Sequence, residues 1–230
     1  MILSQQGQGV CVLRSLTSYW KVRAVISIFV RNRRLFFDRA KIARTSYLDI
    51  GCGSNANPGF LNLDYYWTPD VDLCWDVTRG LPLEDASLRG IFTEHCLEHL
   101  PIRAGFDVLR ECCRVLQPGG RLRIVVPDGE LYLSRYVKVL AGDLSAPLPY
   151  AESDRFRDHH TPMLSVNRIF RYPGHQFIYD FATMRLLLED AGFADIARHA
   201  FRQGVDPALL LDTAERQIES LYVEAEKPNA

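Results

Sequence analysis

Three things are scarce or missing in this 230-residue sequence, and each absence argues against a class of protein. The net charge is -1, so no excess of positive charge points to a nucleic-acid partner. The six cysteines form no CxxC pair and no Cys/His spacing, so no zinc or other metal site is expected. The most apolar stretch near the N-terminus, residues 24–30, is far too short to cross a bilayer.

What is present is an ordinary globular composition. Hydrophobic residues make up 47% of the chain, which suffices for one domain with a full core. Most cysteines lie in apolar stretches, and Cys112 and Cys113 are adjacent, a pattern unlike a disulfide framework. We therefore expect reduced thiols and a cytoplasmic protein.

Residues 1–45 form a separate basic segment, with nine basic residues and one acid, Asp38. Its apolar side chains recur at helical spacing, and its polar side chains form a second stripe. The apolar face contains Val22, Val25, Ile26, Phe29 and Val30, and the polar stripe contains Arg23, Ser27, Arg31 and Arg34. This pattern predicts an amphipathic helix packed on the following domain, as a lid. Peripheral membrane contact and an organelle transit peptide are the alternatives.

Residues 46–230 read as one domain in which strands alternate with helices. Strands are expected at residues 46–51, 59–65, 71–77, 88–95, 121–128, 195–201 and 220–227. Helices are expected from Ile102 to Leu116, from Asp180 to Gly192, and after Asp206-Pro207. The stretch around 129–179 has weak periodicity and is interpreted as an insert. The alternation predicts a parallel sheet with both faces covered.

A glycine loop follows the first expected strand in "YLDIGCGS". Gly51 and Gly53 fit a nucleotide-binding turn, but Ala56 stands where a dinucleotide fingerprint has glycine, and no Walker lysine is present. Asp49 precedes the loop and Asp64 ends the next strand. A carboxylate there suits ribose hydroxyls, and two acids oppose a pyrophosphate while tolerating a sulfonium cation.

At this point the sequence resembles a family, the class I S-adenosylmethionine-dependent methyltransferases of type 11. The resemblance rests on "LDIGCGS" (48–54), "LNLD" (61–64), "WDVTRGLPLEDASLRGIFTEHCLEHL" (75–100), "LRECCRVLQPGGRLRIVVPD" (109–128) and "GHQFIYDFATMRLLLEDAGF" (174–193). It implies a Rossmann-like three-layer α/β/α sandwich of about seven strands, mostly parallel with an antiparallel last strand. It also implies S-adenosylmethionine as cofactor.

The resemblance also implies roles for individual residues. Asp64 would bind the ribose hydroxyls, Asp76 the adenine amino group, and Val77 would donate its backbone N–H to the adenine ring. Glu94 and His95 would face the methyl-bearing sulfur. The full implied cofactor set is Asp49, Gly51, Cys52, Gly53, Asp64, Tyr65, Asp76, Val77, Glu94 and His95.

The acceptor is less sharply indicated, although the resemblance implies that the insert around 129–179 covers it. The short Asn-Pro-Gly loop after the glycines resembles methyltransferases of sugar and cell-surface polysaccharide biosynthesis, which implies a small-molecule or saccharide hydroxyl, with an amine as the alternative. Transfer to a hydroxyl usually needs a base, for which His95, His160, His175 and Tyr179 are candidates. His99 is expected to cap or pack, and His199 to lie on the sixth strand, away from the chemistry. Alignment without any base is the competing hypothesis.

Two other functions are weighed against methyl transfer. A nicotinamide-dependent oxidoreductase is disfavoured by the missing third glycine and the missing long helix. A non-catalytic methyltransferase-fold protein, acting as a partner in a biosynthetic complex through its basic N-terminus, is the alternative from another class.

Overall fold

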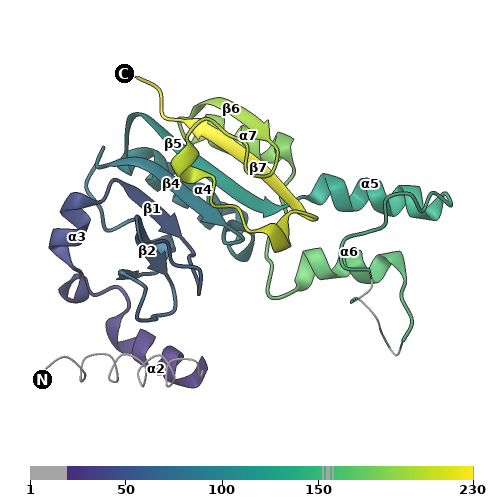
Figure 1. The fold of residues 1–230 in the computed structure, drawn as a ribbon, viewed down its shortest axis with the longest axis horizontal. Helices are drawn as coiled ribbons and strands as arrows, with labels where there is room; N and C mark the ends of the chain where they lie inside the picture. Colours follow the sequence, from purple (N-terminus) through teal and green to yellow (C-terminus); the bar gives the residue numbers. More distant parts are fainter. Residues whose placement is uncertain (1–19, 152, 154–155, 157, 230) are drawn as a thin grey trace, which may run out of the picture.

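The computed structural model describes residues 20–229, apart from 152, 154–155 and 157. Within these residues seven strands form a single sheet in the order β3-β2-β1-β4-β5-β7-β6 (Figure 1). The strands are β1 (Tyr47–Ile50), β2 (Leu61–Asp64), β3 (Leu73–Cys74), β4 (Leu88–Glu94), β5 (Leu116–Pro127), β6 (Ala194–His199) and β7 (Ser220–Glu226).

The sheet confirms the predicted fold class. Strands β1 to β5 pair in parallel, and β7 lies antiparallel between β5 and β6, with Ile124 opposite Val223. The central strands β1, β4 and β5 are apolar and buried because elements cover both faces of the sheet. Since β1, β2, β3 and β4 run in parallel, their carboxyl ends meet at one edge, where this fold places its ligands.

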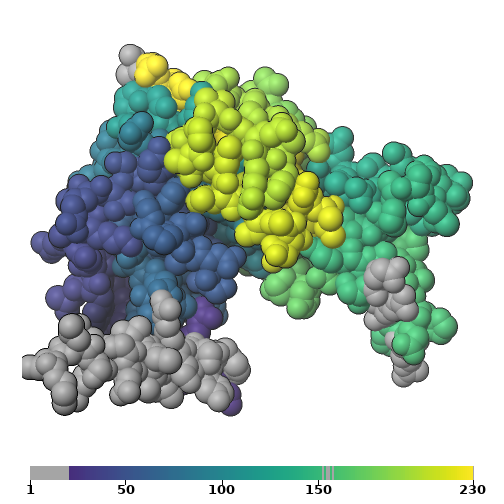
Figure 2. Space-filling model, in the orientation of Figure 1, coloured from purple at the N-terminus to yellow at the C-terminus, as the bar shows by residue number. Residues whose placement is uncertain are grey.

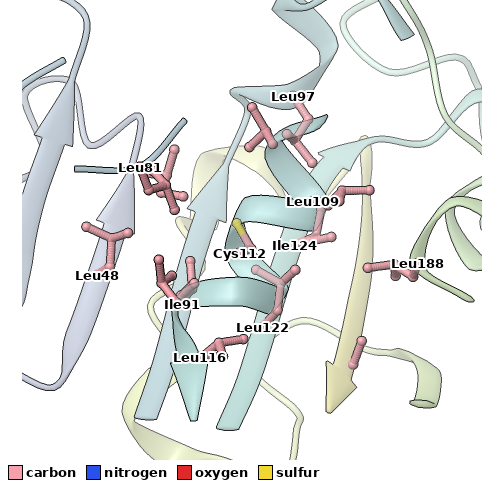
Figure 3. Close-up of a cluster of buried hydrophobic side chains, with 14 of the residues drawn as sticks. Leu48, Leu81, Ile91, Leu97, Leu109, Cys112, Leu116, Leu122, Ile124 and Leu188 are labelled. Atoms are coloured by element: carbon pink, nitrogen blue, oxygen red, sulfur yellow. The ribbon is translucent and has the colours of Figure 1, made fainter. Parts of the chain in front are cut away.

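One face of the sheet carries helices and an apolar core. Helix α4 (Ile102–Val115) and helix α7 (Phe181–Asp190) pack there, close to their expected bounds. Asp180 caps α7 by accepting a hydrogen bond from the Thr183 N–H at 2.8 Å, as its place before the helix predicted. Figure 3 shows α4 directing Leu109 and Cys112 toward strand residues of this core. The five described cysteines, at positions 52, 74, 96, 112 and 113, are free thiols.

The opposite face carries no such helices in the described part of the chain. The residues between β1 and β2 form turns, and the cover comes from the segment between β6 and β7. That segment contains two 3-10 turns, η4 (Pro207–Leu209) and η5 (Ala214–Arg216), where a helix was predicted after Asp206. Leu209 is buried in a second apolar cluster with Phe92 and Val125. In Figure 2 this yellow-green segment lies over the centre of the molecule.

A buried ionic cluster fixes the cover to the sheet. The Arg123 guanidinium donates to Asp212 through Nε at 2.7 Å and to Glu224 through Nη1 at 2.9 Å, and all three side chains are fully buried. Gly204 is required beside the cluster, because a β-carbon there would overlap the Glu224 carboxylate. Both carboxylates thus accept hydrogen bonds from the one guanidinium where no water can solvate them.

The insert contains two helices that its weak periodicity did not predict. Helix α5 (Gly129–Leu140) and helix α6 (Pro162–Arg171) extend away from the sheet and form an arm (Figures 1 and 2). They pack on one another through Tyr132 and Ile169, together with Leu148. Leu133, Val137 and Leu140 remain exposed on α5, so its apolar residues do not mark one buried face.

The N-terminal helix α2 (Trp20–Val30) packs only in part with the expected apolar face: Val30 contacts a buried cluster, and Val22 and Ile26 are half-buried. Val25 and Phe29 are 54% and 60% exposed, whereas Ser27 is fully buried and its hydroxyl accepts a hydrogen bond from the Trp67 N–H at 2.8 Å. A short 3-10 turn, η1 (Arg34–Phe36), and helix α3 (Arg39–Arg44) lead from α2 into β1. Among the described residues, none of the helices has the length and apolar character needed to cross a membrane.

Candidate functional site

The glycine loop after β1 brings the ends of two strands into close contact. Gly51 and Gly53 have φ values of +78° and +56°, a conformation that glycine adopts without strain. A β-carbon at Gly51 would lie 2.7 Å from the Cys96 β-carbon, so only glycine lets the β1 loop approach the residues after β4. The predicted turn is therefore required by packing as well as by backbone conformation.

Asp64, at the end of β2, is held rigidly beside this loop. Its Oδ2 accepts a hydrogen bond from the Gly53 N–H at 2.9 Å, and its Oδ1 accepts one from the Tyr66 N–H at 2.7 Å. Each carboxylate oxygen has a further lone pair, so Asp64 can still accept hydrogen bonds from two adjacent hydroxyls. Tyr65 next to it is half exposed, and the Arg31 guanidinium lies 3.5 Å from its ring centroid.

The segment after β3 forms the next wall. Asp76 caps the turn η2 (Val77–Arg79), and its Oδ1 accepts hydrogen bonds from the Thr78 N–H and hydroxyl. The Asp76 N–H donates to Asn32 Oδ1 at 2.9 Å, so the residue after α2 holds this wall in place.

These walls enclose a cavity of about 710 Å³ at the carboxyl edge of the sheet, which we call the cofactor cavity. Its size is that of a small-molecule site, and its lining combines an apolar surface with a few carboxylates. Of the predicted cofactor residues, it is lined by Gly51, Asp64, Tyr65, Asp76, Val77 and His95.

Three other predicted cofactor residues lie on the far side of the glycine loop. Asp49, Cys52 and Glu94 line a separate cavity of about 240 Å³, which shares only Gly51 with the cofactor cavity. Glu94 accepts a hydrogen bond there from the Thr213 N–H at 2.9 Å, so it points toward the cover and does not line the cofactor cavity. Gly53 lines neither cavity and acts through its bond to Asp64.

Asp49 is the most strongly perturbed acid of this region. Burial raises its pKa to about 7, and the nearby charges of Glu94 and Asp64 act in the same direction. The Asn57 amide, which donates to Asp49 Oδ2 at 2.6 Å, opposes the shift only in part.

A second cavity of about 340 Å³ adjoins the cofactor cavity, and we call it the acceptor cavity. His95, His99 and Pro173 line both. The other lining residues of the acceptor cavity are Glu98, Arg168, Ile169, Tyr172, His175, Arg216 and Glu219. The shared lining means that groups bound in the two cavities would meet beside His95 and His99.

His95 is positioned by two contacts. It has a φ of +49°, and its Nε2 lies 2.9 Å from the Ser220 hydroxyl oxygen. Its Nδ1 lies 3.2 Å from Oε1 of Glu98, a fully buried side chain in the turn η3 (Leu97–His99). His175, from the end of the insert, lines the acceptor cavity as expected, and burial lowers its pKa.

Two predicted catalytic residues do not reach either cavity. His160 lies before α6, and its Nε2 is 3.0 Å from the Ser165 hydroxyl oxygen. Tyr179 is 1% exposed and packs against the Phe177 ring in the core, where burial raises the pKa of its phenol. Both residues were predicted because they lie in the expected insert, but the fold of the insert places their side chains outside the two cavities.

Sequence reasoning missed Glu98, the carboxylate at the centre of the acceptor side. A signal was present, because the pair Glu-His occurs at 94–95 and again at 98–99. Because the two pairs are four residues apart, the repeat would place both histidines close together in the turn that follows β4. Gln176 was also missed, and it lines the cofactor cavity.

The comparisons with known proteins agree with this architecture. Residues 53–124 match the model of the methyltransferase domain family. No curated protein sequence is significantly similar to the chain. A structure of an S-adenosylmethionine-dependent methyltransferase from Thermotoga maritima, titled a possible histamine N-methyltransferase, matches with a TM-score of 0.50 and 14% identity, over 94% of this chain and 98% of that one. A second such enzyme, from Archaeoglobus fulgidus, gives 0.48 and 16%, over 89% and 94%.

The sheet order, the site at its carboxyl edge and the family match define a class. That class is the S-adenosylmethionine-dependent methyltransferases, because residues 53–124 match the methyltransferase domain model and the sheet has the Rossmann-like order with an antiparallel β7. S-adenosylmethionine is accordingly its methyl donor.

Proposed function

We propose that this enzyme methylates a hydroxyl of a small molecule or saccharide bound in the acceptor cavity. The observation that carries the proposal is the shared wall, because His95 and His99 line both cavities. A sulfonium methyl at the inner end of the cofactor cavity would face an acceptor on the other side of that wall.

Within the cofactor cavity, each wall suits one part of the donor. Asp64 would accept the two ribose hydroxyls, and Asp76 the adenine amino group, with the Val77 N–H donating to the ring. The backbone at Gly51 would approach the methionine part. Support comes from the fixed orientation of both carboxylates, which are hydrogen-bonded to neighbouring backbone N–H groups before any ligand binds.

The reaction we propose is a single in-line displacement. The acceptor oxygen attacks the methyl carbon while the bond to sulfur breaks, so the sulfonium leaves as the neutral thioether of S-adenosylhomocysteine. The hydroxyl proton passes to the pair formed by His95 Nδ1 and Glu98, where the buried carboxylate stabilises a protonated ring. An amine acceptor would use the same cavities and is the other outcome of an acceptor screen.

The acceptor cavity also indicates a polar acceptor. Arg168 and Arg216 line it together with the histidines. Arginine binds carboxylate, phosphate or multiple hydroxyl groups through its fork of N–H donors. We therefore propose an acceptor with an anionic or polyhydroxylated end away from the reacting oxygen.

We further propose that residues 20–45 act as a lid over the adenosine end of the cofactor cavity. Arg31 donates from Nε to the Tyr65 carbonyl oxygen at 2.8 Å and stacks on the Tyr65 ring, while Asn32 binds the backbone of Asp76 and Cys74. These contacts reach both proposed adenosine-binding walls. Peripheral membrane contact through this segment is the alternative proposal, and the exposed Val25, Ile28 and Phe29 favour it.

The test is calorimetric titration with S-adenosylhomocysteine of the full chain and of two variants, with NAD titrated in parallel. Asp64→Ala should lose about 1.5–3 kcal/mol of binding, the value of a hydrogen bond to a charged group. Asp107→Ala, an exposed acid on α4, is the matched control and should bind like the wild type. A screen of hydroxylated and amino acceptors then identifies the reacting atom.

Tight binding of NAD, or equal binding of S-adenosylhomocysteine by Asp64→Ala and the wild type, would contradict the proposed cofactor site. Methylation found only on amines would reject the hydroxyl assignment and leave the cofactor site intact.

A further inference from the structure

Glu98 is buried without the partners that a buried carboxylate needs. Its side chain is fully buried, and no described residue donates a hydrogen bond to Oε1 or Oε2. A carboxylate left in this way loses its hydration without compensation, which is rare in folded proteins. The site therefore calls for a positive charge that the described side chains do not supply through a hydrogen bond.

The two nearest imidazoles turn lone pairs, not protons, toward Glu98. His175 Nδ1 lies 2.5 Å from the Ile169 carbonyl oxygen, which can only accept, so Nδ1 carries the proton. In the neutral ring, Nε2 is then bare and lies 4.0 Å from Glu98 Oε1.

His95 repeats this arrangement. The Ser220 hydroxyl donates to the Arg216 carbonyl oxygen, so it must accept from His95 Nε2–H. In the neutral ring, His95 Nδ1 is then bare and faces Glu98 Oε1 at 3.2 Å. Lone pairs converge on one buried point, an arrangement that a cation stabilises.

The residues around this point have the composition of a metal site. Ligand atoms of Glu98, His99 and His175 lie within 4.8 Å of one another, and the rings of His99 and His175 pack edge to face. A ligating histidine commonly donates its other ring N–H to a backbone carbonyl, as His175 does to Ile169.

The backbone holds the two contributing segments together. The N–H groups of Gln176 and Phe177 donate to the Glu98 carbonyl oxygen at 2.7 and 3.2 Å. The Gln176 side-chain amide donates to the His99 carbonyl oxygen at 2.7 Å. The turn after β4 and the end of the insert are thus fixed against each other, which positions their side chains before any ion binds.

We propose that Glu98, His99 and His175 bind one divalent transition-metal ion, of the class of Zn²⁺, Mn²⁺, Fe²⁺ or Co²⁺. Two imidazoles and one carboxylate suit these ions and leave coordination positions open. Metal–ligand distances of about 2.0–2.2 Å require the most widely separated ligand atoms of the three residues to move slightly closer to one another.

The open positions would face the acceptor cavity, which all three residues line. An acceptor hydroxyl bound there would be oriented and made more acidic by the ion. This role rests on the proposed function, whereas the binding of the ion does not.

The experiment uses the full chain, freed of metal by dialysis against a chelator and then titrated with Co²⁺ alone. Visible absorption should show one equivalent bound, and Zn²⁺ should displace it. Glu98→Gln and His175→Ala should each weaken Co²⁺ binding by more than about 100-fold, beyond the 10–100-fold that loss of an outer partner causes. His159→Ala and Glu84→Gln remove an exposed histidine and an exposed acid outside the cluster, and both should bind like the wild type.

Thermal melting of Glu98→Gln in chelator keeps the inference testable if a variant is poorly folded. Without an ion the variant should be at least as stable as the wild type, because it replaces an unpartnered buried charge. With Zn²⁺ added, only the wild type should gain stability. Lack of stoichiometric Co²⁺ binding by the folded wild type, or equal binding by both cluster variants, would overturn the metal site.

The metal site and the proposed function fail in different ways. Titration with S-adenosylhomocysteine in chelator reports on the cofactor cavity alone. Cofactor binding and methyl transfer without any Co²⁺ binding would overturn the metal site and leave the proposed function. Co²⁺ binding by a chain that does not bind S-adenosylhomocysteine would do the opposite.

Discussion

The two halves of the site differ in how their carboxylates are satisfied. In the cofactor cavity, Asp64 and Asp76 are hydrogen-bonded by neighbouring backbone N–H groups. In the acceptor cavity, Glu98 has two oxygens to which no described residue donates. The carboxylates of the cofactor cavity already accept hydrogen bonds, whereas the Glu98 carboxylate still needs an ion or a proton. Variants of the two halves should therefore separate cofactor affinity from turnover.

The largest effect is expected from Gly51→Ala, which disrupts the cofactor half. Its β-carbon would overlap Cys96 and its φ is +78°, so the loop that holds Asp64 must move. We expect a loss of at least about 2 kcal/mol of unfolding free energy and more than about 100-fold in S-adenosylhomocysteine affinity. Urea denaturation and calorimetry measure both.

Gly142→Ala is the matched control, since Gly142 has a φ of +87° but open space around it. It should lose about 1 kcal/mol and keep its affinity. Equal effects of the two variants would show that the close contact with Cys96 is unimportant.

The acceptor half is tested next by His95→Asn. Asparagine tolerates the positive φ of this position but cannot take the proton. We expect kcat to fall by about 100-fold while S-adenosylhomocysteine affinity changes by less than about twofold. His160→Asn is the control, because His160 lines neither cavity, and its kcat should be unchanged. A parallel loss of affinity in His95→Asn would mean that the two halves are not separable.

Asp49 combines features of both halves, since it is buried like Glu98 but hydrogen-bonded like Asp64. Its pKa is raised to about 7 from an ordinary value near 4, so the folded state favours the neutral acid. Its stabilising contribution is complete below about pH 4 and is lost as pH rises to about 7.

Asp49→Asn should therefore gain stability relative to the wild type as pH rises through this window, by about 1–3 kcal/mol at pH 7.5. Urea denaturation at pH 4.5, 6 and 7.5 measures the difference, with Asp107→Asn as the exposed control. A difference that is constant with pH would show that Asp49 titrates normally in the folded chain.

The smallest effect is expected from Arg31→Ala, which loosens the lid over the cofactor half. Loss of one cation–π contact and one hydrogen bond should weaken S-adenosylhomocysteine binding by about 2–5-fold. Arg33→Ala removes an exposed arginine nearby and should have no effect. If only recovery with membranes changes in Arg31→Ala, the segment is an anchor and not a lid.

The sequence predicted the parts of the molecule whose signals are local. Each strand was found from an apolar run, and Gly51, Asp64 and Asp76 were found because they follow strand ends, which a parallel sheet brings together. Helix α5 was missed because Leu133, Val137 and Leu140 are exposed and blur its apolar pattern. The face on which α2 packs was predicted only in part, because the buried Ser27 forms the contact together with Val30 while Val25 and Phe29 stay exposed.

The acceptor half could not be predicted in the same way. Glu98 and His175 meet only because backbone bonds join the turn after β4 to the end of the insert. The sequence therefore contains no metal-binding motif at a fixed spacing. The two Glu-His pairs, at 94–95 and 98–99, indicate only the residues that the turn after β4 contributes. Tyr179 illustrates the converse, since it lies four residues from His175 and yet belongs to the core.

The buried Arg123 cluster has a consequence for how the chain is made. Its guanidinium sits in the middle of the sheet, but its partners Asp212 and Glu224 lie 89 and 101 residues further along the chain. During synthesis, β5 stays without its neighbour β7, and Arg123 stays without both of its carboxylate partners, until residues 212–226 have left the ribosome. The sheet can close only after β7 has emerged, and loss of that strand would remove Glu224 and leave the buried Arg123 with Asp212 alone.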